Sequence, residues 1–275
     1  QPLLERGAQW AATPAQAADE ADCVITMVGY PADVANIYFG SGSVIAEDDP
    51  VLPALDTLKP QADGIIAAAK QNAVLIDMTT SDPQLAMRIA HTGRERNVMA
   101  LDCPVSGGDV GARNAALSIM CGGDERAFER VRPILDRLGK TVVLQGEAGA
   151  GQSTKMCNQI AIASGLIGVC ESMAYAENAG LDPQRVLSNI EHGAAGSWSL
   201  SNLAPRMIKG DFAPGFYVEH FIKDMRIAEQ NAHQAGIETP GLTLARRMFE
   251  RLAEDGHERE GTQALYRAYR KEALS

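Results

Sequence analysis

The chain has 275 residues, of which 45% are hydrophobic and 22% are charged, and its formal net charge is −10. This composition is that of an ordinary globular protein and excludes disordered, collagenous and disulfide-stapled proteins. An acidic chain without a basic run is not expected to bind nucleic acid, and no stretch reaches the roughly 20 apolar residues of a membrane span. Five scattered cysteines without a CxxC pair indicate reduced thiols in a cytoplasmic protein and no metal site.

The first half of the chain alternates short apolar runs with helical patterns. The sequence Ser81-Asp82-Pro83 supplies an N-cap and a first-turn proline for one of these helices. Near-continuous apolar strands separated by helices predict a doubly wound, mostly parallel sheet with helices on both faces. The predicted strands are residues 23–29, 74–79, 98–105, 117–121 and 141–144.

The second half of the chain is predicted to be all helical. Apolar residues recur at helical spacing from residue 151 to about residue 180, which predicts a helix of roughly 45 Å. An α/β half followed by a helical half predicts two domains, residues 1–148 and residues 149–275, joined by this long helix. Further helices are predicted at residues 183–191, 200–208, 218–235, 242–254 and 263–271.

Two glycine pairs come close to the dinucleotide fingerprint G-x-G-x-x-G. Gly40-Ser-Gly42 has Ile45 at the third glycine position, and Gly149-Ala-Gly151 has Thr154 there. Neither pair opens a helix directly after a strand near the start of the domain, as the fingerprint requires. Glycine spacing alone therefore gives little support to cofactor binding.

The first segment with a chemical signature is Asp102-Cys-Pro-Val-Ser106-Gly107-Gly108, at the carboxyl end of a predicted strand. Strand ends in open α/β sheets face the ligand crevice. A Ser-Gly-Gly turn exposes backbone N–H groups that can hold a carboxylate. The alternative is a tight turn without a ligand.

The second segment places Lys155 near the start of the long helix, with Asn158 and Gln159 three and four residues further on. Residues at this spacing share one face of a helix. A lysine with a lowered pKa and an amide neighbour can act as a general acid and base. The alternative is a solvated surface lysine.

The third segment is Lys223-Asp224 in a later helix, where two apolar residues precede the lysine. A second enclosed cation would attract an anionic substrate and help to lower the pKa of Lys155. The alternative is a solvated charged stripe formed by Lys223, Asp224 and Arg226.

Taken in order, these segments resemble the 3-hydroxyisobutyrate dehydrogenase (β-hydroxyacid dehydrogenase) family, which is related more distantly to 6-phosphogluconate dehydrogenase. The resemblance covers essentially the whole chain, and a long ordered set of motifs is far more specific than one glycine pattern. The segments that carry it are residues 26–31 (TMVGYP), 76–80 (IDMTT), 102–108 (DCPVSGG), 122–123 (GG), 149–158 (GAGQSTKMCN) and 223–224 (KD).

The resemblance implies a Rossmann domain followed by an all-helical domain, and an oxidoreductase that uses NAD or NADP. Its substrate would be a small β-hydroxy acid or the corresponding semialdehyde. Lys155 would be the catalytic lysine, and Asn158 would orient the reacting oxygen. The substrate carboxylate would bind to Ser106, Gly107 and Gly108, and Lys223 would close the site near substrate and cofactor. Residues Met27, Val28, Gly29, Tyr30 and Thr80 would line the nicotinamide side.

The resemblance also implies a homodimer or homotetramer. In the family, a Gly-rich strand–turn–helix and a strand that recognises the ribose would occupy roughly 30–40 residues before Gln1, on the scale of one βαβ unit, together with the residues that distinguish NAD from NADP. Two alternatives stay open at this point. One is an imine-reducing relative, against which the retained Lys155 argues. The other is a non-catalytic cofactor-binding or scaffold protein.

Overall fold

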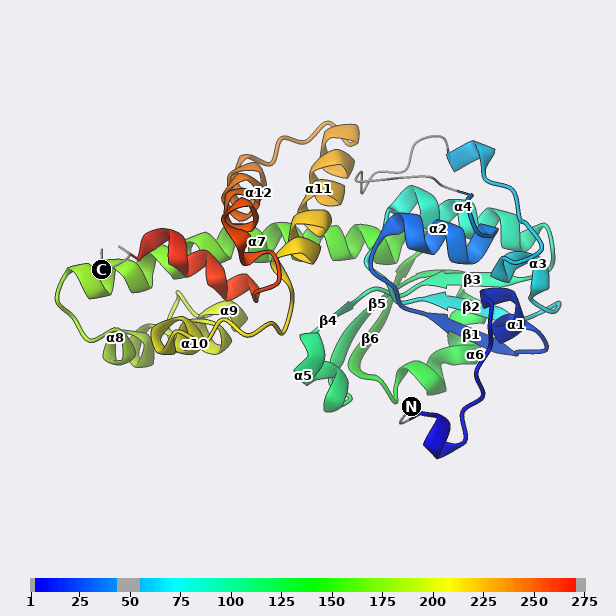
Figure 1. The fold of residues 1–275 in the computed structure, drawn as a ribbon, viewed down its shortest axis with the longest axis horizontal. Helices are drawn as coiled ribbons and strands as arrows, with labels where there is room; N and C mark the ends of the chain where they lie inside the picture. The colour runs from blue at the N-terminus through cyan, green and yellow to red at the C-terminus, as the bar shows by residue number, and fades with distance from the viewer. Residues whose placement is uncertain (1–2, 44–54, 271–275) are drawn as a thin grey trace. The chain divides into compact units, whose positions relative to one another are not determined.

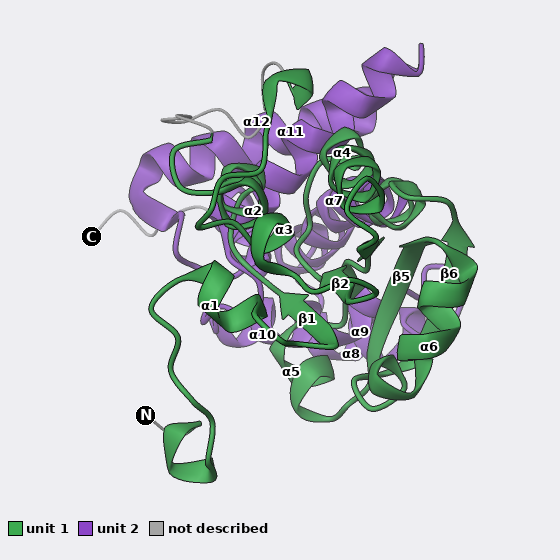
Figure 2. Ribbon diagram, turned by 90° about the vertical axis from the view of Figure 1, so that its right-hand side faces the viewer, with its two compact units in different colours: residues 1–155 green, residues 156–275 purple. Residues whose placement is uncertain are grey.

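A computed structural model describes residues 3–43 and 55–270 of the chain. The chain forms two compact units, residues 1–155 and residues 156–275, which are considered separately below (Figure 2). Helix α7 (Ala150–Asn178) contributes its first residues to unit 1 and the remainder to unit 2. The predicted domain boundary at residue 148 lies directly before this helix.

Unit 1 is built on a six-stranded sheet in which β1, β2 and β3 are parallel neighbours (Figure 1). Strand β5 runs antiparallel to β3 and β4, and β6 is parallel to β5. The sheet is thus mixed, because the short connection from β4 to β5 returns the chain without a long crossover. The strands are β1 (Cys23–Thr26), β2 (Val74–Asp77), β3 (Met99–Asp102), β4 (Val105–Ser106), β5 (Leu117–Gly123) and β6 (Gly139–Gly146).

Helices cover both faces of the sheet, as predicted for a Rossmann-type domain. Successive residues of a strand point to opposite faces, so Leu75 packs in one hydrophobic cluster with α2 and α4, while Val74 and Ile76 pack in another with α6. Figure 1 shows α2 and α4 on one side of the sheet and α6 on the other. The helices of unit 1 are η1 (Leu4–Arg6), α1 (Pro14–Ala18), α2 (Pro31–Phe39), η2 (Leu55–Thr57), α3 (Ile65–Ala68), α4 (Pro83–Arg94), α5 (Gly108–Arg113) and α6 (Glu125–Leu135).

The strand predicted at residues 98–105 is two strands, β3 and β4, because Cys103 and Pro104 interrupt it. The Cys103 N–H donates to the Asp77 carbonyl on one side, and the Pro104 carbonyl accepts from Met120 N–H on the other. Proline has no N–H with which to continue a ladder. This change of partner leaves Asp102 at the carboxyl end of the central strand β3, next to the start of α7.

Unit 2 is all helical, as predicted, with one hydrophobic core formed by α7 and the helices that follow it. The helix predicted at residues 200–208 is divided at Leu203 into two shorter helices, and the last predicted helix is a 3-10 helix. The helices after α7 are α8 (Pro183–Ile190), α9 (Trp198–Asn202), α10 (Ala204–Lys209), α11 (Val218–Gln234), α12 (Pro240–Leu252), η3 (Ala253–His257) and η4 (Thr262–Tyr269).

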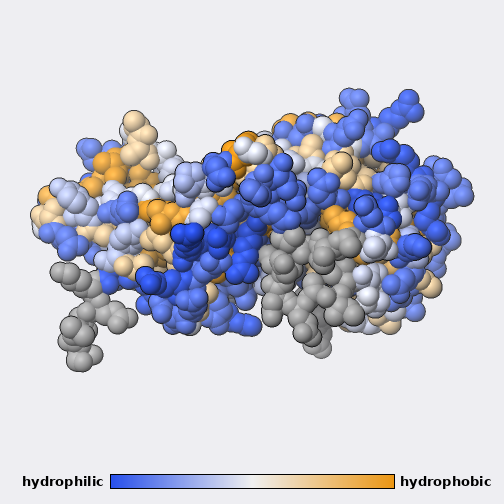
Figure 3. All heavy atoms as spheres, turned by 90° about the horizontal axis from the view of Figure 1, so that it is seen from above, coloured by the Kyte–Doolittle hydropathy of each residue, from blue (hydrophilic) through white to orange (hydrophobic). Residues whose placement is uncertain are grey.

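Helix α7 is the one helix among the described residues that is long and apolar enough to cross a membrane by those two criteria. Half of its most apolar segment is buried inside the protein, which is also typical of the core helix of a soluble fold. On the face of the molecule shown in Figure 3, hydrophilic residues predominate and apolar residues occur in small groups.

Candidate functional site

The residues predicted to line the nicotinamide follow the carboxyl ends of β1 and β2. Met27 is 66% exposed and Tyr30 is 38% exposed, although both are large apolar or aromatic side chains. The backbone N–H of Val28 donates to Thr79 Oγ1 at 2.9 Å, so the loop after β1 is joined to the loop after β2, which contains Thr80. The structure therefore brings five of the six predicted cofactor residues to the carboxyl ends of β1 and β2, whereas the sixth, Lys223, belongs to unit 2.

A buried carboxylate, Asp77 at the end of β2, accepts hydrogen bonds from two residues next to these loops. Its Oδ1 accepts from Thr26 Oγ1 at 3.0 Å and from the Thr79 N–H at 3.1 Å. Burial raises the pKa of Asp77 to about 6, against the opposing effect of the bonds from Thr79 and Thr26, and the nearby Asp102 raises it further. The carboxylate thus holds the Thr79 turn in place while paying a desolvation cost.

A second buried carboxylate, Asp102 at the end of β3, caps the start of α7. Its Oδ1 accepts from the Gly149 N–H and its Oδ2 from the Gln152 N–H, each at 2.8 Å. The first N–H groups of a helix have no partner within the helix, and a carboxylate at this position also interacts favourably with the helix dipole. Burial raises the pKa of Asp102 to about 6, although the N–H groups that it accepts from act in the opposite direction.

Gln152 joins the start of α7 to the loop after β2. Its side chain is fully buried, its Oε1 accepts from the Ser81 N–H at 2.9 Å, and its Nε2 donates to the Thr79 carbonyl at 2.7 Å. One side chain therefore satisfies two backbone groups of the loop that contains Thr80. The loop and the first turn of α7 are held as one unit.

The glycines around this junction are required by close packing. A Cβ at Gly122 would lie 2.6 Å from the Gly151 nitrogen and 2.7 Å from Asp102 Oδ1. A Cβ at Gly151 would lie 2.8 Å from Asp102 Oδ2 and still closer to the carbonyl oxygens of Asp102 and Met120. The Gly149-Ala-Gly151 sequence thus lets helix α7 approach strands β3 and β5. This close packing explains why two glycines stand here, and a role in binding a pyrophosphate is not needed to explain them.

The predicted carboxylate-binding turn begins at Ser106, the last residue of β4. Gly107 has a φ of +126° and Gly108 has a φ of +62°, backbone conformations that residues other than glycine rarely adopt. Ser106 and Gly107 are partly exposed and Gly108 is exposed, so their polar groups are accessible. This geometry is compatible with the predicted role, which stays a prediction.

Lys155 lies in the second turn of α7 and is only 6% exposed. The interpretation of a solvated surface lysine is therefore wrong. Because Gln152 is three residues before it, the side-chain position of Lys155 depends on the turn that Asp102 and Gln152 fix. The burial of Lys155 is the feature of unit 1 that most favours a functional role for this lysine.

In unit 2 the structure brings together Asn158, Gln159, Lys223 and Asp224. Asn158 Nδ2 donates to Gln159 Oε1 at 2.8 Å, and Gln159 Nε2 donates to Asp224 Oδ2 at 2.5 Å. Lys223 Nζ lies 3.0 Å from Asp224 Oδ1, an ion pair rather than a well-directed hydrogen bond. Lys223 and Asp224 are 5% and 1% exposed, so the solvated stripe is wrong for these two residues and holds for the exposed Arg226 alone.

Four residues that shape these clusters were not predicted from the sequence as functional: Thr79, Asp102, Gln152 and Asp224. From the sequence, Asp102 opens the segment of the Ser-Gly-Gly turn, and Asp224 follows Lys223 either in an enclosed site or in a solvated charged stripe. The available signal was a carboxylate at the end of a strand followed by glycines at positions 122 and 151, which allow a helix to come close. No local pattern indicates that Asp224 contacts Gln159, which is 65 positions away in the chain.

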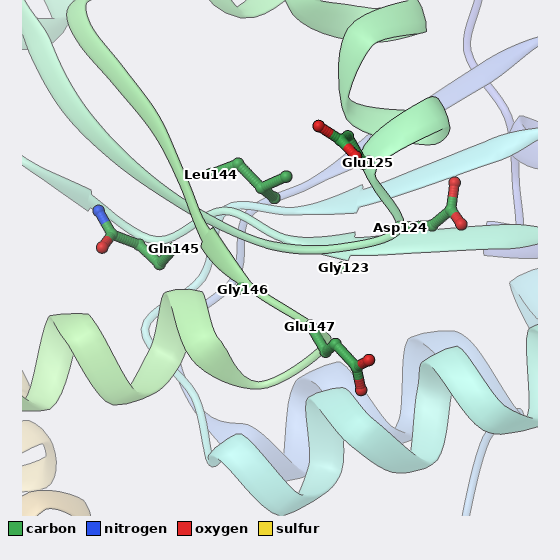
Figure 4. A pocket seen from close by; sticks show the side chains of 7 residues that line it. All are labelled: Gly123, Asp124, Glu125, Leu144, Gln145, Gly146 and Glu147. Carbon is green, nitrogen blue, oxygen red and sulfur yellow. The ribbon is translucent and has the colours of Figure 1, made fainter.

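The structure also contains an open pocket of about 460 Å³, lined at the carboxyl ends of β5 and β6 (Figure 4). Three of its residues, Asp124, Glu125 and Glu147, carry carboxylates, and none of the predicted site residues lines it. An acidic lining does not favour a phosphate or a carboxylate ligand. The pocket is therefore not assigned to the cofactor or the substrate.

The edge formed by the loops after β1 and β2 does fit a nicotinamide. Ser81 Oγ, next to Thr80, is buried and has no hydrogen-bond partner among the described residues. A buried polar atom without a partner is rare and calls for a ligand or water. Exposed Met27 and Tyr30 add apolar surface that a flat ring can cover.

Two family models together match nearly the whole chain. Residues 149–269 match the NAD-binding domain of NADP-dependent 3-hydroxyisobutyrate dehydrogenase. Residues 1–51 and 50–146 match the NAD-binding domain of 6-phosphogluconate dehydrogenase. NAD or NADP is therefore the cofactor, as predicted.

Individual proteins agree with these models. An uncharacterized oxidoreductase of Bacillus subtilis is 52% identical over 98% of this chain and 86% of its own length. The 2-hydroxy-3-oxopropionate reductase of Escherichia coli is 34% identical over 97% of this chain and 84% of its own. The crystal structure of 3-hydroxyisobutyrate dehydrogenase from Salmonella typhimurium has a TM-score of 0.80 and 26% identity, covering 97% of this chain and 86% of that one. The chain belongs to the 3-hydroxyisobutyrate dehydrogenase family of NAD(P)-binding oxidoreductases.

Proposed function

We propose that this protein interconverts a small β-hydroxy acid and its semialdehyde, with Lys155 as the general acid and base. The observation that carries the proposal is the buried position of Lys155, one turn beyond the α7 start that Asp102 and Gln152 attach to the sheet. A lysine is not buried in a fold without a compensating role or partner.

The substrate class follows from what relatives are named for. The Escherichia coli relative is a 2-hydroxy-3-oxopropionate reductase, and a Pseudomonas aeruginosa relative, 31% identical, is a 3-hydroxyisobutyrate dehydrogenase. Both names describe a small carboxylic acid with an oxygen function on its third carbon. A site for such a molecule needs a carboxylate binder and a proton-transfer group, and the proposed Ser106 turn and Lys155 supply these two functions.

The bound nicotinamide supplies the hydride transfer. In the oxidation direction, Lys155 Nζ accepts the proton of the substrate hydroxyl, and in the reduction direction the ammonium group returns it. Asn158, three residues later on the same helix, holds the reacting oxygen, and the N–H groups and hydroxyl of the Ser106–Gly108 turn hold the carboxylate. Lys223 closes the site near the substrate and the cofactor.

The test uses the purified full-length protein. Binding of NADH and of NADPH is measured by fluorescence titration, and turnover is then measured with 3-hydroxyisobutyrate, glycerate, serine, 4-hydroxybutyrate and their carbonyl partners. We expect binding of at least one cofactor and turnover of at least one three-carbon or branched β-hydroxy acid. Binding without turnover of any of these compounds would support the scaffold alternative, and reduction of an imine alone would support the imine-reducing alternative.

We also propose that the protein forms a homodimer or homotetramer through unit 2. Six large apolar or aromatic side chains of this unit are between 41% and 73% exposed, and an interface between subunits would bury such side chains. They are Tyr175, Leu181, Trp198, Tyr217, Ile237 and Leu244. Light scattering after size-exclusion chromatography measures the mass directly, and a monomer at micromolar concentration would contradict the proposal.

A further inference from the structure

Four side chains of unit 2 form a continuous polar chain from Asn158 to Lys223. The donor–acceptor distances are 2.8 Å from Asn158 to Gln159 and 2.5 Å from Gln159 to Asp224, followed by the 3.0 Å ion pair between Asp224 and Lys223. Gln159 is fully buried and Asp224 is 1% exposed, whereas Asn158 is partly exposed. The chain therefore runs from a buried charge to an accessible amide.

The chemistry of these groups fixes the direction in which each hydrogen bond of this polar chain is donated. A carboxylate paired with an ammonium group has only acceptor oxygens, so Gln159 must present an N–H to Asp224. The carbonyl oxygen of Gln159 is then turned toward Asn158 and can only accept. Asn158 consequently uses one N–H for Gln159, and its own carbonyl oxygen and second N–H stay in fixed positions for another partner.

We propose that Asp224 is a positioning residue that sets the amide orientation of Asn158 through Gln159. The inference rests on the proposed function in one respect, namely that Asn158 holds the reacting oxygen of the substrate. Without the carboxylate, an amide can rotate by half a turn and exchange its oxygen and its NH₂ group at little cost. An amide that rotates freely no longer holds its donor at the substrate oxygen. Complete loss of such a donor costs about 100-fold or more in kcat, so loss of its fixed position is expected to cost about 10-fold to 100-fold.

A purely structural role predicts a different outcome. In that case Asp224 only neutralises Lys223 and holds α11 against α7, and its removal lowers stability without acting through Asn158. Because Asp224→Asn leaves Lys223 without its counter-charge, this variant alone does not separate the two roles. Gln159→Met does, because it interrupts the polar chain, keeps the side-chain volume similar and leaves the Lys223–Asp224 pair intact.

The kinetic experiment is a double-mutant cycle. We expect Gln159→Met to lower kcat about 10-fold to 100-fold, with the cofactor Kd changed by less than about 2-fold, and the same substitution to have almost no further effect in an Asn158→Ala protein. The matched control is Asn178→Ala at the far end of α7, whose amide donates to the Ala174 carbonyl of the same helix, and which should leave kcat unchanged. Independent, additive losses in the cycle would overturn the proposal.

A spectroscopic measurement tests the same chain without turnover. In ¹⁵N-labelled protein, the side-chain NH₂ signals of Asn158 and Gln159 should show one strongly shifted, slowly exchanging proton each. In the Gln159→Met protein the Asn158 signals should approach those of a free amide. If the wild-type protein turns over no β-hydroxy acid but these signals behave as expected, the proposed function fails and the orientation of Asn158 stands. If the wild-type protein turns over a β-hydroxy acid but the Asn158 signals are the same in the Gln159→Met protein, the inference fails and the proposed function stands.

Discussion

The substitution Gly151→Ala tests the junction between α7 and the sheet. The new Cβ would lie 2.8 Å from Asp102 Oδ2 and closer still to two backbone carbonyl oxygens, of Asp102 and Met120. An ordinary carbon contact is about 3.5 Å, so the first turn of the helix must move by about 1 Å. Neither carbonyl can yield, because Asp102 is paired with Gly122 of β5 and Met120 is paired with Val143 of β6.

The expected cost follows from this displacement. Overpacking costs about 1–3 kcal/mol, and weakening the two bonds from Gly149 and Gln152 to Asp102 adds about 1 kcal/mol or more each. We therefore expect the free energy of unfolding to fall by about 3 kcal/mol or more. Because Lys155 is four residues along the same helix, a shift of about 1 Å should also lower kcat by about 100-fold.

The matched control is Gly168→Ala on the same helix. Gly168 is exposed and a Cβ there meets no atom within 4 Å, so alanine should increase stability by up to about 1 kcal/mol through its helix propensity. Urea unfolding followed by circular dichroism, together with steady-state kinetics on both variants, gives the comparison. A Gly151→Ala protein as stable and active as the wild type would refute the close packing of α7 on the sheet.

Three further predictions concern the individual side chains. Lys155→Ala should lower kcat by about 1,000-fold while the cofactor Kd measured by fluorescence changes by less than about 2-fold, and normal turnover would remove the catalytic assignment. Ser106→Ala should raise KM about 10-fold with little change in kcat, because a bond to the carboxylate is present before and during the reaction, and a loss confined to kcat would contradict this. Asp77 binds a proton more readily in the folded protein, with a pKa of about 6 against an ordinary 3.8, so the stability that it contributes is lost as pH rises from about 4 to 6. At about 1.4 kcal/mol per unit, Asp77→Asn should gain up to about 3 kcal/mol over the wild type across that range in urea unfolding, and a constant difference would show that Asp77 does not titrate there.

Much of the fold is visible in the sequence because it depends on local periodicity. The apolar runs of β2 and β5, and the helical spacing of α7, each reflect burial of one element and need no knowledge of its neighbours. The break between β3 and β4 was missed because an apolar run continues through Cys103 and Pro104, and only the competing partners Asp77 and Met120 show where the ladder changes.

The site was predictable in part, for a related reason. Family motifs gave Lys155, Asn158 and Lys223, but the motifs do not state what holds each side chain. The supporting contacts join residues far apart in the chain, such as Asp102 with Gly149 and Gln159 with Asp224. A charged residue looks the same in a sequence whether it is solvated or buried with a partner, so these roles required the tertiary structure.

The attachment of the α7 start to the sheet has a consequence for the order of folding. Helix α7 can form locally, since its turns depend on neighbouring residues. Its acceptors at Asp102 and the partners of Gln152 lie between 47 and 73 positions earlier in the chain, and contacts of this separation form only after loops are closed. During refolding, the recovery of helical signal should therefore precede the recovery of activity, because Lys155 reaches its final position only when β2, β3 and β5 have assembled.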